Sequence, residues 1–371
     1  MSGSPLVSVL LPVHNGERYL RESVGSILSQ TWHDFELVVI NDGSNDGTAS
    51  ILESYNDPRM FVVENRKNLG LVKSLNLGLK RARGEYVARQ DADDVSSPHR
   101  FGAQVEFLQS HSDVAIVGSD YIEMDQGRRT RVRMPQNVLT LRWHALFQNP
   151  FAHSTVMFRR AIVTELGGYA DRAEALHVED YELWLRLMWS GRRMANLTEP
   201  LVHWRANPDG ISKTWASEQT ENFLALVRTN LRRLAPWLLG DDRLVALVWR
   251  LQVCGGFNEP LAQVDKALRI LEELVNNFCD YFGLDSGQKQ LVRQMSRRRA
   301  ARTMLHNAKQ CSYTERLPEA REFAALALSL DKRLALSSSY RKLRVKSLLG
   351  QGPTARWRNT QKRIKRAVHL S

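Results

Sequence analysis

The stretch that decides the fold is EYVARQDADD (residues 85–94), in which a short apolar run leads into the carboxylates Asp91, Asp93 and Asp94. So much negative charge at a strand end is unfavourable unless a cation or extensive hydrogen bonding offsets it. Hard divalent cations take such oxygen ligands, and a substrate diphosphate would complete their coordination. The alternative is a solvated turn before a helix, with Asp94 or Ser96 as its N-cap.

Outward from this stretch, apolar strand patterns alternate with helical patterns along the first part of the chain. Strands are expected at residues 8–13, 36–41, 60–64, 85–90 and 114–117, and helices at 20–28, 48–55, 71–83 and 98–110. This alternation implies right-handed crossovers and a mainly parallel central sheet with flanking helices, which is a Rossmann-like α/β fold.

Polar clusters follow three of these strands. HNG (residues 14–16), DGS (42–44) and DADD (91–94) each begin where a strand is expected to end. Because ligands of such sheets collect at the carboxyl ends of the strands, these three loops are expected to converge on one site.

The loop after the second strand has a competing interpretation. Its oxygen-bearing residues and glycine match most positions of an EF-hand calcium loop: Asp42, Ser44, Asp46, Gly47, Ser50 and Glu53. An EF-hand requires an incoming helix, however, and residues 37–40 (LVVI) are typical of a strand. The sequence therefore favours a strand followed by a binding loop.

Charge divides the chain into two parts. The formal net charge is +12; residues 1–220 hold 24 Lys and Arg against 27 Asp and Glu (24 − 27 = −3), and residues 221–371 hold 28 against 13 (28 − 13 = +15). Beyond residue 217 only helical patterns remain, including apolar stripes over 264–278 and 317–328. The sequence predicts an α/β domain over residues 1–217 and a basic, all-helical region over 218–371.

The expected location of the protein follows from what the chain lacks and from its basic end. No signal-peptide core and no apolar run of bilayer length is present, and the three cysteines are widely spaced, so a cytoplasmic protein with reduced thiols is expected. Residues 332–371 contain no acid, and residues 356–366 mix cations with Trp357 and Ile364. We expect attachment to an anionic membrane surface, the inner face of the plasma membrane, with a solvated helix face as the alternative.

An ordered series of motifs runs through the first part of the chain. The motifs are PVHNG (12–16), VINDGSNDGT (39–48), NLG (68–70), DADD (91–94) and VEDYELW (178–184). In this order they resemble the family 2 glycosyltransferases, inverting enzymes with a GT-A fold that use nucleotide-sugar donors. The resemblance covers residues 5–215 and leaves the helical region outside.

The resemblance implies a donor site at the first two loops. Pro12, His14 and Asn15 would line the base and ribose of the nucleotide. Asp42 would accept a hydrogen bond from the uracil N–H, so a UDP-sugar is the expected donor. The alternative for Asp42 is turn chemistry, since Asp-Gly-Ser also begins helices.

The same resemblance makes Asp91 and Asp93 a D-x-D pair. Asp93 would coordinate Mn²⁺ or Mg²⁺ directly, with Asp91 beside it, nearer the ribose or uracil, and Asp94 in support. The ion would bridge the diphosphate and offset the charge of the leaving group. Arg89 is either a further diphosphate partner or the solvent-side residue of its strand.

The third metal ligand departs from the family pattern. Asn207 stands where a histidine is usual, and an amide oxygen is a weaker ligand for a hard cation. His203 and Asp209 are the other candidates.

Glu179 and Asp180 match the acidic pair of the family, in which the second acid is the usual general base. Inverting transfer is a single displacement, so one carboxylate must take the proton of the attacking acceptor hydroxyl. The expected acceptor is a glycan or a lipid-linked sugar of a surface polysaccharide. The alternative is a helix N-terminus whose acids favour the helix dipole.

Two other function classes compete with a glycosyltransferase. A sugar nucleotidyltransferase would need a glycine-rich basic loop after the first strand, and residues 12–18 are not one. A nucleic-acid-binding protein is suggested by Arg297-Arg298-Arg299 and the basic end, but no nucleic-acid-binding fold signature accompanies them, so no nucleic-acid partner is expected.

Overall fold

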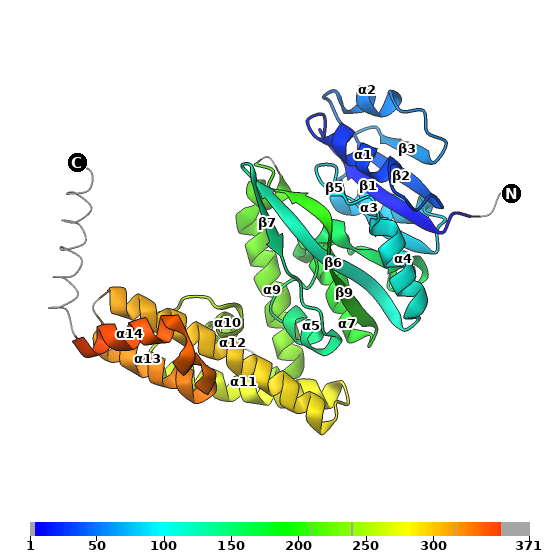
Figure 1. The fold of residues 1–371 in the computed structure, drawn as a ribbon. Coiled ribbons are helices and arrows are strands. Elements are labelled where there is room, and N and C mark those ends of the chain that lie inside the picture. The colour runs from blue at the N-terminus through cyan, green and yellow to red at the C-terminus, as the bar shows by residue number, and fades with distance from the viewer. Residues whose placement is uncertain (1–3, 209, 239, 315, 350–371) are drawn as a thin grey trace, which may run out of the picture. The chain divides into compact units, whose positions relative to one another are not determined.

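The computed structural model describes residues 4–208, 210–238, 240–314 and 316–349 (Figure 1). The chain divides into two compact units, Met1–Val227 and Arg228–Ser371. The division falls inside helix α9 (Ala216–Leu234), and the boundary expected after residue 217 lies at the start of that helix. The assignment of residues 1–217 as a catalytic domain stays a prediction.

The first unit is built on one nine-stranded sheet with flanking helices. The strand order is β3-β2-β1-β4-β8-β6-β9-β5, and β7 pairs with β6. The strands are β1 (Val7–Val13), β2 (Phe35–Asp42), β3 (Met60–Asn65), β4 (Tyr86–Arg89), β5 (Val95–Ser96), β6 (Val114–Asp125), β7 (Arg128–Val132), β8 (Met157–Arg159) and β9 (Arg193–Arg205). The helices before α9 are α1 (Leu20–Leu28), α2 (Thr48–Glu53), α3 (Leu71–Arg81), α4 (Arg100–Ser110), α5 (Val138–Ala145), α6 (Arg160–Glu165), α7 (Glu179–Trp189) and α8 (Ile211–Thr214).

The first half of the sheet has the parallel arrangement that the sequence predicts. Strand β1 pairs in parallel with β2 and β4, and β2 pairs in parallel with β3. The expected α/β fold class is confirmed. Strands β5, β7, β8 and β9 are not among the strands expected from the sequence, and β8 joins β4 to β6 by antiparallel pairing. The apolar signal is weak in β7 and β8, because β8 has three residues and β7 is mostly exposed and arginine-rich.

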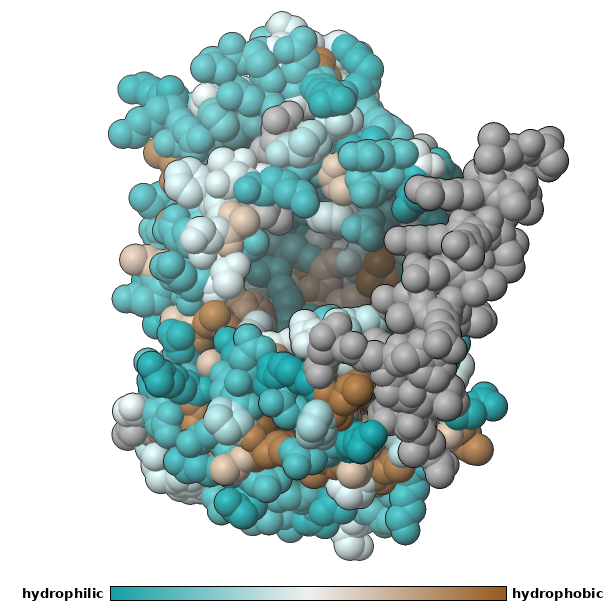
Figure 2. Space-filling view, turned by 90° about the vertical axis from the view of Figure 1, so that its left-hand side faces the viewer, coloured by the Kyte–Doolittle hydropathy of each residue, from teal (hydrophilic) through white to brown (hydrophobic). Residues whose placement is uncertain are grey.

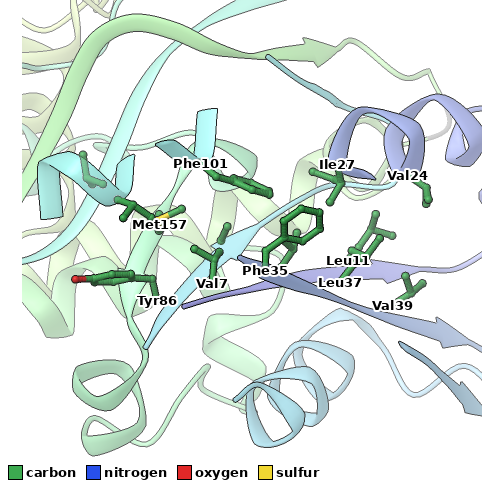
Figure 3. Packing of buried hydrophobic residues seen from close by; sticks show 14 of the residues in the cluster. Val7, Leu11, Val24, Ile27, Phe35, Leu37, Val39, Tyr86, Phe101 and Met157 are labelled. Atoms are coloured by element: carbon green, nitrogen blue, oxygen red, sulfur yellow. The ribbon is translucent and has the colours of Figure 1, made fainter. Parts of the chain in front are cut away.

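One face of this sheet packs against α1 and α4 through alternate residues of the strands (Figure 3). Val7, Val9 and Leu11 of β1 belong to this core with residues of β2, α1 and α4. The rings of Phe35 and Phe101 meet edge to face, with their centroids 5.5 Å apart. Because each fully buried side chain of this size contributes roughly 1.5–3 kcal/mol, this core stabilises the packing of α1 and α4 on the sheet.

The second unit is helical and is described by itself. Its helices are α10 (Asp242–Val253), α11 (Leu261–Tyr281), α12 (Ser286–Tyr313), α13 (Leu317–Leu330) and α14 (Ser338–Leu349). The two apolar stripes expected from the sequence are buried faces of α11 and α13. Cys254, Cys279 and Cys311 are free thiols, as expected.

Hydrophilic residues predominate on the face shown in Figure 2. Within the described ranges, none of the helices combines the length and apolar character that a bilayer crossing requires. The basic segment 356–366, on which the expected membrane attachment depends, lies outside the described residues.

Candidate active site

Hydrogen bonds join the loop after β1 to the loop after β2. The backbone N–H of Asn15 donates to Ser44 Oγ at 2.9 Å, and that of Gly16 donates to Thr48 Oγ1 at 2.8 Å. Asn15 has a left-handed φ of 53°, a conformation that asparagine tolerates. The two loops therefore form one surface at the carboxyl end of the strands, as the sequence predicts.

The predicted donor residues differ in exposure on that surface. His14 and Asn15 are exposed, whereas Pro12 is buried within β1 beside Ile40. His14 Nδ1 lies 2.9 Å from the backbone oxygen of Asp42, so the imidazole is held at the end of β2. The two exposed side chains are available to a ligand, and Pro12 lies beneath them in the sheet.

Asp42 is buried and anchors the loop that follows β3. Its carboxylate accepts hydrogen bonds from the backbone N–H groups of Leu69 and Gly70, both at 2.9 Å, and from Asn65 Nδ2 at 2.8 Å. Residues 35–42 form β2, so the loop after them lacks the incoming helix of an EF-hand, and that alternative is wrong. A nucleotide contact of Asp42 stays a prediction.

The Asp91–Asp94 loop is held by the end of β9. Arg205 donates from its backbone N–H to Asp94 Oδ1 at 2.8 Å and from Nε to the backbone oxygen of Asp93 at 2.9 Å. Asn207 Nδ2 donates to Asp93 Oδ2 at 2.8 Å. The residue that replaces the usual histidine therefore lies directly against the predicted metal ligand.

Burial and mutual repulsion disfavour ionisation of this loop. The pKa of Asp93 is raised, first by burial and then by the charge of Asp91. The pKa of Asp94 lies well above its usual range because of burial and because of the Asp91 and Asp93 carboxylates, although Ser154 and the N–H of Arg205 act in the opposite direction. A positive charge bound here would relieve the repulsion.

Arg89 is the buried counter-charge of this site. Its side chain is only 2% exposed and forms an ion pair with Asp91. The suggestion that Arg89 is a solvent-side strand residue is therefore wrong: β4 is an interior strand, and the guanidinium faces the acids. Among the described residues, no group accepts a hydrogen bond from Arg89 Nε. Burial is the largest single influence on the pKa of Arg89 and lowers it, but the charge and hydrogen bond of Asp91 outweigh burial, so the pKa is raised.

Glu179 and Asp180 begin helix α7, where acids are favoured by the helix dipole. Asp180 Oδ2 accepts a hydrogen bond from Asn149 Nδ2 at 2.8 Å, and Oδ1 accepts one from the N–H of Tyr181 at 2.6 Å. Burial, followed by the Asp180 charge, raises the pKa of Glu179 to about 8. Burial also raises the pKa of Asp180, and its hydrogen bonds partly offset that effect.

The acids of the Asp91–Asp94 loop and the Glu179–Asp180 pair lie in one electrostatic environment. The positive charge of Arg89 lowers the pKa of both Glu179 and Asp180, and the charge of Asp91 raises both. The charge of Asp91 after β4 thus acts on the ionisation of the carboxylates at the start of α7, which are about 90 residues away in the chain. Acids from separate elements around one guanidinium form a candidate active site.

Tyr169, which the sequence analysis missed, is buried within the field of Arg89 and of the Asp180 and Glu179 charges. Its phenol lies 3.0 Å from His153 Nε2, and its backbone is held by Asn76 through two hydrogen bonds of 2.8 and 2.9 Å. The pKa of His153 lies well below its usual range because of burial and the Arg89 charge, so its ring is neutral. Tyr169 belongs to no local motif, so only the folded chain identifies it.

The donor set suits a hard divalent cation. Asp91 and Asp93 supply carboxylate oxygens, and the amide nitrogen of Asn207 donates to Asp93, which leaves the amide oxygen of Asn207 as a further oxygen beside the pair. In the described part of the chain, no cluster of three or more His, Cys, Asp or Glu could by itself hold a metal ion. An ion here would therefore need oxygens from the amide or from a ligand. His203 lies within β9, and Asp209 is outside the described residues.

The raised pKa of Glu179 predicts a pH-dependent cost in stability. Because the pKa in the folded protein, about 8, lies above the ordinary value of 4.5, the native state loses stability as the pH rises through this window. We expect Glu179→Gln to raise the free energy of unfolding at pH 8.5 by up to several kcal/mol, at about 1.4 kcal/mol per tenfold difference in acidity. Denaturant unfolding of wild type and Glu179→Gln at pH 5 and pH 8.5 measures this difference in the free energy of unfolding.

The matched control is Glu174→Gln, which removes an exposed carboxylate of the preceding loop and should change stability little at either pH. An equal effect of Glu179→Gln at both pH values would show that Glu179 ionises normally in the folded protein.

Comparison with known proteins identifies the fold and the family. A sequence model of Glycosyl transferase family 2 matches residues 8–167. EpsE of Bacillus subtilis (strain 168), named as a glycosyltransferase, is 35% identical over 241 residues, which cover 63% of this chain and 84% of EpsE. The amylovoran biosynthesis glycosyltransferase AmsE of Erwinia amylovora is 35% identical over 231 residues, covering 61% of this chain and 86% of AmsE.

Solved structures share the fold. TarS 1–349 of S. aureus, crystallised in complex with UDP-GlcNAc, superposes with a TM-score of 0.53 at 19% identity, over 83% of this chain and 91% of that one. The mannosyltransferase PcManGT of Pyrobaculum calidifontis, in complex with GDP-Man and Mn²⁺, gives a TM-score of 0.50 at 17% identity, over 94% and 85%. The fold is of the GT-A type, and with the sequence matches to its relatives the chain belongs to glycosyltransferase family 2.

Proposed function

We propose that this glycosyltransferase moves a sugar from a nucleotide-sugar donor, a UDP-sugar, to a glycan or lipid-linked acceptor in the biosynthesis of a cell-surface polysaccharide, with inversion at the anomeric carbon. One observation carries the proposal: the buried guanidinium of Arg89 forms an ion pair with Asp91 and also lowers the pKa of Glu179 and Asp180. The Asp91–Asp94 loop would lie at the departing diphosphate, and the Glu179–Asp180 pair would accept the proton of the acceptor hydroxyl. AmsE is named for amylovoran biosynthesis, which supports a polysaccharide as the product. TarS was crystallised with UDP-GlcNAc, which supports a UDP-sugar as the donor.

The donor side of the proposed site is the surface formed by the loops after β1 and β2. His14 and Asn15 are exposed there and would contact the base and ribose. Among the described residues, Asp42 Oδ2 accepts one hydrogen bond, from the N–H of Gly70, and so keeps capacity for a further donor such as the uracil N–H.

The acceptor side is the start of α7. Asp180 would accept the proton of an acceptor hydroxyl as its oxygen attacks the anomeric carbon and the bond to the nucleoside diphosphate breaks. The raised pKa of Asp180 makes its carboxylate a stronger base, which suits this role. Asn149 would keep the carboxylate pointing in one direction through its hydrogen bond.

Asp93 and Asp91, with the amide oxygen of Asn207 in the third place, would hold Mn²⁺ or Mg²⁺. When bound, the cation would supply positive charge to the leaving diphosphate. The protein's own contribution is to fix the Asp93 carboxylate through Asn207 and the loop backbone through Arg205.

Donor binding is tested with His14→Ala. We expect the nucleotide-sugar Kd to rise about tenfold, the equivalent of one hydrogen bond or stacking contact, with kcat little changed. His14 suits this test better than Asp42, because Asp42→Ala would also release three hydrogen bonds that hold the loop after β3.

Thermal stabilisation of wild type and His14→Ala by a panel of nucleotide sugars, with Mn²⁺ present, measures the change in donor affinity. The control is His33→Ala, an exposed histidine that precedes β2 at the opposite end of the strand. A donor affinity that is the same for wild type, His14→Ala and His33→Ala would remove the loop after β1 from the donor site.

A further inference from the structure

The first turns of α9 form hydrogen bonds with residues 176–177, which precede the proposed catalytic carboxylates Glu179 and Asp180. Gln219 Nε2 donates to the backbone oxygen of His177 at 2.8 Å, and Asn222 Nδ2 donates to that of Leu176 at 2.9 Å. His177 has a left-handed φ of 63° and stands two residues before Glu179. The start of α9 is therefore fixed beside the predicted acceptor side of the site.

Trp215 stands immediately before α9 and packs against this segment. Its indole is stacked on the imidazole of His177, with ring centroids 5.2 Å apart and an angle of 14° between the planes. The Trp215 side chain is nevertheless 49% exposed, whereas that of His177 is 14% exposed. One face of the indole is thus supported by the protein, and the other is available to a ligand.

The contacts define a rigid aromatic surface next to the proposed base. Indole has two rotatable side-chain bonds, and the stack on His177 restricts them, so little entropy remains to be lost when a ligand binds. Leu176, in the same segment, is 41% exposed and extends the apolar character. Aromatic rings bind flat ligands with apolar faces and polar edges well, because their own edges remain hydrated.

We infer that Trp215 is the platform on which a pyranose ring of the glycan acceptor stacks, an inference that rests on the proposed glycosyltransferase function. A pyranose presents an apolar C–H face to the indole and hydroxyl groups around its rim. The imidazole that supports the indole belongs to His177, three residues before Asp180, so the stacked sugar would lie toward the start of α7. The platform would position the acceptor, and Asp180 would take its proton.

The inference is tested by saturation-transfer NMR with methyl glycosides of glucose, galactose and N-acetylglucosamine as probes. Trp215→Ala should weaken binding of the glycoside that wild type binds best by about tenfold, the range for an aromatic contact. Trp215→Phe should retain most of the affinity. The matched control is Trp237→Ala, which removes another exposed indole, 55% exposed, from the helical unit and should have no effect.

Hydrolysis of nucleotide sugar without acceptor separates this inference from the proposed function. We expect Trp215→Ala to hydrolyse donor at the wild-type rate. Binding of none of the three glycosides by wild type, equal binding by wild type and Trp215→Ala, or an equal loss of hydrolysis and glycoside binding would overturn the platform. Glycoside binding that depends on Trp215 without hydrolysis of any donor would instead overturn the proposed function and leave Trp215 as a sugar-binding residue.

Discussion

Asp93→Asn is expected to lower the rate of glycosyl transfer by at least about three orders of magnitude, because preorganised charge stabilisation is among the largest catalytic contributions. The variant is expected to remain folded. Asp93 sits in a loop outside the apolar core, and burial followed by the charge of Asp91 raises the pKa of its carboxylate. Replacing it with a neutral amide of the same shape relieves that repulsion, so the melting temperature should stay the same or rise.

Transfer and donor affinity of wild type and Asp93→Asn are measured with Mn²⁺, with Mg²⁺ and in excess chelator. The divalent ion should raise donor affinity in wild type and much less in the variant. Asp171→Asn, which neutralises an exposed carboxylate of the same unit, is the matched control and should behave as wild type. Undiminished wild-type transfer in excess chelator, or an Asp93→Asn enzyme within tenfold of wild type, would refute the metal assignment.

Asp180→Asn is expected to lower kcat by roughly two to four orders of magnitude, the range for loss of a general base, with donor affinity nearly unchanged. The amide cannot accept a proton, and it keeps the size of the carboxylate beside Asn149. The two carboxylate variants therefore differ in which step they impair: Asp93→Asn loses the donor response to divalent ion, whereas Asp180→Asn keeps it.

Presteady-state and steady-state rates of transfer, with donor binding measured separately, distinguish these effects. Glu174→Gln again serves as the control for a nearby exposed acid. If Asp180→Asn lost donor affinity and kept its turnover, the base would have to be sought at Glu179 and then at His177.

The part of the fold that the sequence predicts is the part with local apolar periodicity. β1 and β2 are continuous buried runs, so their existence and the loops at their carboxyl ends follow from the pattern. Because parallel strands present these ends at one edge, the joining of the loops after β1 and β2 could be foreseen as well.

Long-range side-chain pairing could not be foreseen. Asn207 bonds to Asp93 across 114 positions, and Arg205 bonds to Asp94 across 111, and neither pair leaves a local signal. Arg89 is a further case, because arginine is seldom fully buried and its burial here depends on acids that only the folded chain brings around it. The same holds for Tyr169, whose backbone is fixed by Asn76 across 93 positions.

Release of nucleoside diphosphate from a panel of UDP-, GDP- and other nucleotide sugars, with Mn²⁺ present, tests the central claim most directly. We expect the purified full-length protein to release the diphosphate from at least one UDP-sugar, and Asp93→Asn to release almost none from the same donor. Release from no donor in the panel, or equal release by wild type and Asp93→Asn, would contradict the assignment of these residues to nucleotide-sugar-dependent transfer.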